Sequence, residues 1–253
     1  MDNFINLIEN DYGKQVQFGD SRYYQKGDKW FPGITEVLNT LSKGKQYEMW
    51  LKSNGFNADV LARQAMDEGS HVHEAIQDLC NGKEVSFMGA TQNNYNRREW
   101  QIINRFMDFY NEWKPKIIAV EKVLVSEKLG FGSQIDLIIE LNNEIWLIDH
   151  KTGAIYDTAY LQTSAYVKLW EEYFPKQKIK KVGILHLDSA HRGRDAKGKS
   201  IQGQGWKLIE VEDTEKHYGD FQHILALWNR SNPDYKPFIL TYPATLKLNK
   251  DND

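Results

Sequence analysis

The sequence predicts an α/β fold in which a sheet built around one β-hairpin is covered by helices. Residues 132–151 (GSQIDLIIELNNEIWLIDHK) form two apolar runs around Asn142-Asn143, and asparagine tolerates the positive φ of a two-residue turn. Both faces of this hairpin are apolar, which is typical of a sheet that is covered on both sides. Helical patterns lie before and after the hairpin, over 57–80, 94–113 and 156–174.

The composition is that of a globular protein with a sizeable core. The chain has 253 residues, of which 41% are hydrophobic, and its net charge of −3 indicates no overall basic character. Contact with nucleic acid would therefore need a local basic patch. The single cysteine excludes an intramolecular disulfide and a four-cysteine iron–sulfur cluster within the chain. The acidic start and the lack of an apolar run of about 18 residues predict a cytoplasmic protein without a membrane span.

One domain over residues 1–253 is expected, with an N-terminal part over 1–56, a core over 57–230 and a tail over 231–253. In the N-terminal part, residues 15–31 alternate in polarity and contain turn residues, which predicts a β-hairpin or small meander. Two short helices are predicted to follow it, over 34–42 and 46–54. The N-terminal part as a whole is expected to be mainly helical.

The helix predicted over 57–80 begins with Asn57 as its N-cap and carries one histidine of interest, His73. Gly69 lies four residues before His73, so both residues share one helix face. A glycine inside a helix costs about 1 kcal/mol relative to alanine, and room for a ligand beside His73 is one reason to accept that cost. A neutral imidazole there could join a metal site, but a structural or surface role is the alternative for a lone helical histidine.

Further segments are expected to extend the sheet and its cover. A strand over 116–127 carries Glu121 among apolar neighbours, where an unpaired carboxylate would be costly, so Glu121 either helps to bind a metal or pairs with a lysine. The helix over 156–174 places Gln162 and Tyr166 on one face, near the hairpin if it packs back over the sheet. Two strands over 180–188 and 205–211 and a helix over 213–229 complete the pattern.

The segment over 189–204 is predicted to be a long polar loop that carries four cations. Long loops in compact domains are often functional, and this one could follow a nucleic-acid backbone. A solvated loop without that function is the alternative. The four cations are Arg192, Arg194, Lys197 and Lys199.

The hairpin itself predicts a catalytic arrangement. If Asn142-Asn143 is the turn, Asp136 lies directly opposite Asp149, with Cβ atoms about 4.5–5.5 Å apart. Lys151 shares that face and His150 points to the other, because side chains alternate along a strand. Two facing carboxylates repel each other unless a divalent cation lies between them, and a lysine beside them could orient or deprotonate water or stabilise negative charge. Solvated aspartates on a surface hairpin are the alternative.

Four motifs carry a family resemblance: Gly69-Ser-His-Val-His73, Gly132-Ser-Gln-Ile-Asp136, Ile148-Asp149-His-Lys151-Thr-Gly153 and Gln162-Thr-Ser-Ala-Tyr166. In this order they resemble the RecB-like branch of the PD-(D/E)xK nuclease superfamily. The segment Phe31-Pro-Gly-Ile-Thr35, followed by Trp50, is similar to the N-terminal part of related phage exonucleases and of the mitochondrial genome maintenance exonuclease. The resemblance runs from about residue 30 to residue 187.

This resemblance implies a restriction-endonuclease-like core with a mixed central sheet flanked by helices. It also implies Mg²⁺- or Mn²⁺-dependent cleavage of DNA, often from a single-stranded end. The implied metal ligands are His73, Asp136, Asp149 and the backbone carbonyl of His150. Lys151 would position or activate the water, and Gln162 and Tyr166 would hold the active site and the substrate. Glu121 matches only a loose acidic position, and Asp149 stands where many relatives have glutamate.

The expected function is therefore that of a metal-dependent DNA exonuclease in replication, repair or recombination. Some members of the superfamily hold an iron–sulfur cluster with a set of cysteines. This chain lacks that set, so it is not expected to belong with them. A structure-specific endonuclease or nickase of the same superfamily is one alternative, and a catalytically silent nucleic-acid-binding protein is the other. The sequence does not define a protein partner.

Overall fold

The larger sheet of the computed structural model has five strands in the order β11-β8-β7-β6-β5, and its directions are mixed. β5 (Lys116–Ser126), β6 (Phe131–Leu141) and β7 (Glu144–Lys151) are antiparallel, β8 (Lys181–His186) runs parallel to β7, and β11 (Lys207–Glu210) is antiparallel to β8. The structure describes residues 6–18, 21–42, 44–88, 95–188, 192–194, 200–202 and 205–237.

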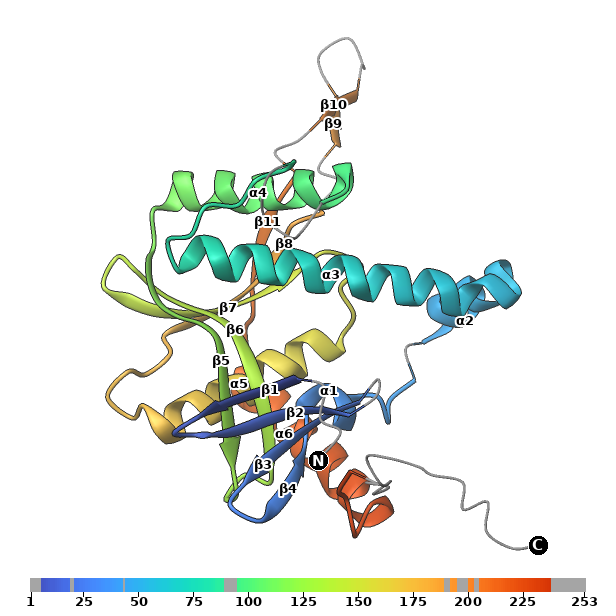
Figure 1. The fold of residues 1–253 in the computed structure, drawn as a ribbon, viewed down its shortest axis with the longest axis vertical. Coiled ribbons are helices and arrows are strands. Elements are labelled where there is room, and N and C mark those ends of the chain that lie inside the picture. The colour runs from blue at the N-terminus through green and yellow to red at the C-terminus, as the bar shows by residue number, and fades with distance from the viewer. Residues whose placement is uncertain are drawn as a thin grey trace, which may run out of the picture.

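Helices cover both faces of this sheet, as the sequence predicts (Figure 1). One face packs against α3 (Ala58–Cys80) and α4 (Arg97–Trp113), in a core that includes Ile76, Phe106 and Leu137. The other face packs against α1 (Ile34–Leu38), α5 (Thr158–Tyr173) and α6 (Thr214–Ser231). α5 is the crossover that joins the parallel strands β7 and β8. No helix in the described part of the chain is long and apolar enough to cross a membrane.

The hairpin of β6 and β7 has the register that the sequence predicts. Its pairs run from Leu141–Glu144 at the turn to Leu137–Ile148, and the regular pairing ends there, one position before Asp136 and Asp149. Asn142 and Asn143 form the turn with φ values of 52° and 62°, the left-handed conformation that asparagine tolerates. The prediction of a two-residue asparagine turn is therefore confirmed.

The N-terminal part is richer in strand than the sequence reading allowed. β1 (Asn6–Asn10), β2 (Gly13–Phe18), β3 (Ser21–Lys26) and β4 (Lys29–Pro32) form a second, four-stranded antiparallel sheet. The meander predicted over 15–31 is confirmed, but a mainly helical N-terminal part is wrong. Only α1, α2 (Lys45–Asn54) and a short 3-10 turn (Gly55–Asn57) precede α3. The sequence pattern does not predict the short strand β1, because its stability comes from pairing with β2 rather than from its own pattern.

The segment over 189–204 is not a plain loop, because it contains the antiparallel strands β9 (Arg192–Arg194) and β10 (Ser200–Gln202). That prediction is wrong for the backbone of these six residues. Residues 238–253 of the expected tail lie outside the described part of the chain.

The glycine inside α3 gives a stability prediction. A Cβ placed on Gly69 would meet only Thr152 Oγ1 at 3.6 Å, an ordinary contact. Gly69→Ala should therefore gain most of the helix propensity that glycine lacks, about 1 kcal/mol, and raise the melting temperature by roughly 2–4 °C. A thermal melt of both proteins checks this. A lower melting temperature would mean that α3 needs glycine at this position to approach the end of β7.

Candidate active site

Alternation along β7 sends its last three side chains to two different faces of the sheet. Asp149 and Lys151 face α5, whereas His150 lies between them and faces α3, where its ring centroid is 4.0 Å from that of His73. Asp149 and His150 are fully buried, so both side chains are held in the interior of the domain. The site therefore has one half on each side of β7, and Asp136 of β6 lies between the two halves.

The half that faces α5 is centred on the ammonium group of Lys151. Its Nζ lies 3.1 Å and 2.9 Å from the two carboxylate oxygens of Asp149, and it donates to Gln162 Oε1 at 3.1 Å. Gln162 Nε2 in turn donates to the hydroxyl of Tyr166, one helical turn further along α5. The lysine is therefore oriented by one acceptor from the sheet and one from the helix.

The pKa values of this pair follow from burial and mutual charge. Burial alone would lower the pKa of Lys151, but the charges of Asp149 and Asp136 outweigh it and raise the pKa above its ordinary value. Burial raises the pKa of Asp149 to about 6, against the opposing charge of Lys151. Lys151 is consequently a cation at neutral pH in this arrangement, and it can donate hydrogen bonds or stabilise negative charge.

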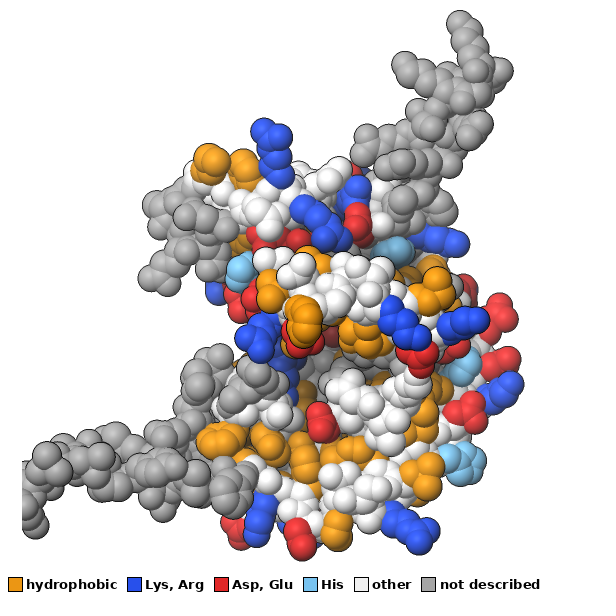
Figure 2. Space-filling model, turned by 90° about the vertical axis from the view of Figure 1, so that its right-hand side faces the viewer, with side chains coloured by type: hydrophobic (Ala, Val, Ile, Leu, Met, Phe, Trp, Pro, Cys, Tyr) orange, Lys and Arg blue, Asp and Glu red, His pale blue; other side chains and the backbone are white. Residues whose placement is uncertain are grey.

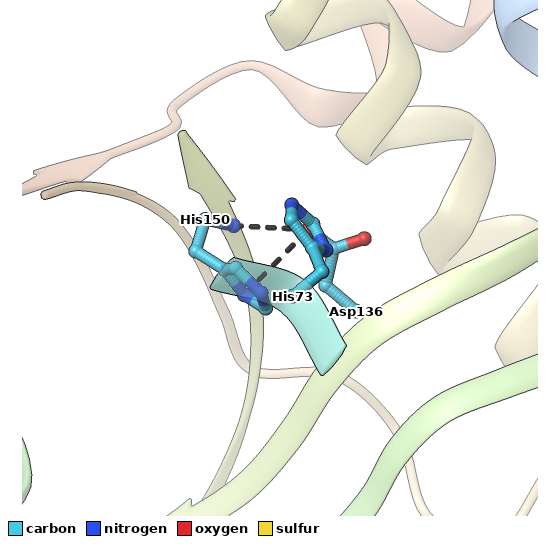
Figure 3. Close-up of side chains that lie close together, drawn as sticks. All are labelled: His73, Asp136 and His150. Atoms are coloured by element: carbon cyan, nitrogen blue, oxygen red, sulfur yellow. Dashed lines mark hydrogen bonds and ion pairs between the residues drawn. The ribbon is translucent and has the colours of Figure 1, made fainter. Parts of the chain in front are cut away.

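The half that faces α3 brings together two imidazoles and two carboxylates. His73 Nδ1 lies 2.9 Å from Glu121 Oε1, and His150 Nδ1 lies 3.6 Å from Asp136 Oδ2. Asp136 Oδ2 also accepts the backbone N–H of His150 at 3.0 Å. One ligand atom from each of His73, Asp136 and His150 lies within 4.8 Å of the others, and Figure 3 shows the three side chains converging from three elements.

Charge and burial oppose each other strongly in this half of the site. Burial lowers the pKa of His73, but Asp136 and Glu121 outweigh it and raise the pKa to about 9. Burial raises the pKa of Glu121 to about 7, although the hydrogen bond from His73 lowers it. For Asp136 burial raises the pKa, yet the surrounding cationic groups bring it below the ordinary value. Burial and the neighbouring charge of His73 lower the pKa of His150 to about 3, so that this imidazole is neutral.

Glu121 has an unusual backbone. Its φ of 46° is left-handed in the middle of β5, where its neighbours Val120 and Lys122 pair regularly with Leu137 and Ile135. A left-handed conformation costs a residue other than glycine roughly 1–2 kcal/mol, and such strain occurs preferentially at functional sites. It places the Glu121 carboxylate beside His73. The sequence left open a metal or a lysine as its partner; the structure places His73 beside it, and the metal role of Glu121 stays a prediction.

The donor set fits a divalent cation. Among the described residues, neither ring nitrogen of the fully buried His150 has a hydrogen-bond partner, a costly arrangement for a buried polar group. Three carboxylates, those of Glu121, Asp136 and Asp149, are buried within the same small region. Buried carboxylate oxygens and a neutral imidazole nitrogen are ligands for Mg²⁺ or Mn²⁺, and a bound cation would neutralise their repulsion.

Two arginines of α4 hold α3 and α4 against the strand ends beside the site. Arg98 lies 2.9 Å from Glu68 of α3 and 2.8 Å from Asp188, the second residue after β8. Arg105 lies 2.7 Å from the other carboxylate oxygen of Asp188. The guanidinium groups are engaged in ion pairs, so their contribution is to fix the helix that carries His73 in position.

The four cations predicted to contact nucleic acid cannot be placed. Lys197 and Lys199 lie outside the described residues, and for Arg192 and Arg194 only the backbone of β9 is described. On the face that Figure 2 shows, basic and acidic side chains are interspersed around a recess between the upper and lower parts of the molecule. The DNA-binding prediction for these four residues therefore stays a prediction.

Comparison with known proteins identifies one family. The family model described as the PD-(D/E)XK nuclease superfamily matches residues 46–236, about three quarters of the chain. No curated protein matches the sequence. The matched segment includes α3, the five-stranded sheet and α5, and with them every side chain of the two half-sites.

Proposed function

Because the chain belongs to the PD-(D/E)XK nuclease superfamily, we propose that it is a metal-dependent deoxyribonuclease that hydrolyses phosphodiester bonds. The observation that carries this proposal is the meeting of Asp136, in the middle of β6, with Asp149 and Lys151, at the end of the neighbouring strand β7. A nuclease needs a cation and a positive group at one phosphate, and these three residues supply both in one place. The mixed five-stranded sheet with helices on both faces is consistent with the superfamily's restriction-endonuclease-like fold.

The proposed metal ligands are His73, Asp136 and Asp149, together with His150. When bound, Mg²⁺ or Mn²⁺ would supply Lewis-acid stabilisation of the phosphate oxygens. The resemblance implied the backbone carbonyl of His150 as a ligand, but its unpartnered ring beside His73 and Asp136 supports the imidazole as well. Two imidazole nitrogens favour Mn²⁺ over Mg²⁺, because Mg²⁺ prefers oxygen ligands.

Lys151 is proposed to act as a fixed cation. Hydrolysis forms a bond from a water oxygen to phosphorus while the bond to the leaving oxygen breaks. A proton of that water passes to solvent, the leaving oxygen takes up a proton from solvent, and negative charge builds up on the phosphate oxygens in the transition state. The ammonium group, held by Asp149 and Gln162, can orient that water and stabilise this charge. Gln162 and Tyr166 are proposed to keep the lysine in place from α5. Glu121 is proposed to orient His73 through the hydrogen bond to its Nδ1.

Substitution of His150 separates the two possible ligand atoms. His150→Leu should raise the melting temperature of the metal-free protein by about 2–4 °C, because it removes a buried imidazole whose nitrogens are unpartnered. If the ring is a ligand, the additional stabilisation by Mn²⁺ should shrink. Melts with and without Mn²⁺ measure both effects. A full Mn²⁺ effect in the variant would leave the backbone carbonyl as the only contribution of His150.

We further propose that the enzyme is a RecB-like exonuclease that degrades DNA from single-stranded ends in replication, repair or recombination. The four motifs support this assignment because the side chains that they contribute assemble at one site. An endonuclease or nickase would use the same residues, and a silent binding protein would retain them without turnover.

End-labelled linear and closed circular single-stranded DNA, each incubated with Mg²⁺ or Mn²⁺, distinguish these possibilities. An exonuclease should degrade the linear strand and leave the circle intact, whereas cleavage of the circle would favour the endonuclease. DNA binding without cleavage of either substrate, in both metals, would overturn the proposed activity.

A further inference from the structure

The hydrogen-bonded side chains of the site continue into the N-terminal sheet. That sheet, over residues 6–32, lies outside the segment that the family model matches. Its residue Tyr24 is only 4% exposed, although it belongs to a separate sheet from the catalytic strands. The phenol ring of Tyr24 packs on β6 between the site and the N-terminal sheet, so the two parts of the chain share one interior.

Two glycines make a slot for the Tyr24 ring. A Cβ on Gly132, at the start of β6, would lie 2.6 Å from Tyr24 Cβ and Cγ, and a Cβ on Gly33 would lie 2.9 Å from its Cε2. The backbones of Gly33 and Gly132 also form an isolated parallel bridge. Any side chain at Gly132 would force the ring or the strand to move. The N-terminal sheet is therefore seated against β6 in one defined position, four residues before Asp136.

From this slot the Tyr24 hydroxyl reaches the catalytic half-site by way of Ser133. Ser133, which is 5% exposed, follows Gly132 on β6 and lies near enough to Tyr24 and Tyr166 to lower the pKa of both phenols. Tyr166 accepts from Gln162, and Gln162 accepts from Lys151. Buried polar groups thus extend from Tyr24 past Ser133 to Tyr166, which is hydrogen-bonded through Gln162 to the ammonium group.

A second branch leads from the same tyrosine to the opposite half of the site. Gln15 Nε2 donates to the Tyr24 hydroxyl at 2.9 Å and lies 3.1 Å from Gln134 Oε1. Gln134 Nε2 reaches the backbone carbonyl of Glu121 at 3.5 Å. Hydrogen bonds from the N-terminal sheet therefore also reach Glu121, the strained residue that is proposed to orient His73. Tyr24 lies where the two series of polar groups meet.

We propose that Tyr24 is a positioning residue, which acts through Ser133 and Tyr166 to hold Gln162 and Lys151 in their catalytic geometry. The N-terminal sheet would then be a working part of the active site, although it lies outside the family match. This inference rests on the proposed nuclease activity. It assigns no contact between Tyr24 and the substrate, because Tyr24 is buried in the interior.

The first test removes one hydroxyl and leaves the slot filled. Tyr24→Phe should lower kcat about tenfold, the rate equivalent of one ordinary hydrogen bond, while KM and the melting temperature change little. Tyr23→Phe is the matched control, because Tyr23 is the preceding residue of β3 and points to the other face, where it stacks on Tyr235. Equal kcat values for Tyr24→Phe, Tyr23→Phe and the unaltered protein would overturn the proposal.

A double-mutant cycle tests whether Tyr24 acts through Tyr166. If it does, Tyr24→Phe should have almost no further effect on kcat in a Tyr166→Phe protein, since the link is already broken. Independent, additive losses would mean that Tyr24 supports only the fold, and would overturn the proposal. The unaltered enzyme is assayed in parallel on linear DNA. If it cleaves DNA while the cycle is additive, the positioning role fails and the nuclease function stands; if it does not cleave, the function itself fails.

Discussion

Replacing Lys151 with methionine is expected to reduce kcat for metal-dependent DNA cleavage by about a thousandfold, the upper range for loss of one preorganised charge-stabilising group. Methionine keeps most of the apolar stem but removes the ammonium group that contacts Asp149 and Gln162. KM should change much less than kcat, because the interaction with the phosphate strengthens only as negative charge builds up. Single-turnover cleavage of an end-labelled strand measures the chemical step directly.

The matched control for this substitution is Lys181→Met. Lys181 begins β8, lies 3.1 Å from Glu210 and sits over the ring of Trp146, at the opposite end of the β7–β8 pair from Lys151. Its loss should leave the cleavage rate within about twofold of the unaltered enzyme, as expected for an exposed ion pair far from the site. A Lys151→Met enzyme as fast as this control would remove Lys151 from the mechanism.

Replacing Asp136 with asparagine is expected to abolish both cleavage and stabilisation by metal. At a Mn²⁺ concentration one hundred times the dissociation constant, binding adds about 2.7 kcal/mol to the stability, or roughly 5–10 °C in melting temperature. The amide keeps the shape of the side chain but loses the negative charge that lies beside His73 and His150. The Mn²⁺-dependent rise in melting temperature should therefore disappear, and titration calorimetry should detect no binding.

Glu140→Gln provides the control, because it neutralises another acidic side chain on the same strand. Glu140 lies near the hairpin turn, where it pairs with Lys116 at 2.9 Å and takes no part in the site. This variant should keep the full Mn²⁺ effect. Retention of that effect in Asp136→Asn would show that the cation binds elsewhere, even if the variant no longer cleaves DNA.

These expectations have a common physical origin in the crowding of buried charge. Asp136, Asp149 and Glu121 lie in a region where burial alone disfavours every carboxylate charge. Lys151 and His73 offset part of that cost, and the left-handed backbone of Glu121 adds strain. Such an arrangement is retained when it preorganises a site, and a bound cation would relieve the remaining repulsion.

Much of one half-site could be predicted from local sequence patterns. The period of two along β7 puts Asp149 and Lys151 on one face, and a two-residue turn at Asn142-Asn143 leaves only one register for the hairpin. The same register brings Asp136 and Asp149 to the positions just beyond the Leu137–Ile148 pair, where their charges interact. The α/β class followed in the same way, because helical and strand periods differ and both were clear in the sequence.

His73 and Glu121 of the other half-site were candidates from the sequence, but their mutual contacts could not be predicted, because these contacts depend on elements that are distant along the chain. His73 meets Glu121 only after α3 packs across β5, and the pairing joins residues 48 positions apart. The left-handed φ of Glu121 has no local cause, since glutamate does not favour it. The unpartnered ring of His150 likewise becomes visible only when its surroundings are in place.

The sequence by itself therefore determined the fold class, the hairpin register and the face shared by Asp149 and Lys151, because these depend on backbone periods and on a short turn. Tertiary structure alone decided that two imidazoles converge on Asp136 and that the N-terminal sheet is seated against β6 through Tyr24. Those arrangements depend on which faces of distant elements pack together. Such packing is selected by the burial of the whole core, and a local sequence pattern does not predict it.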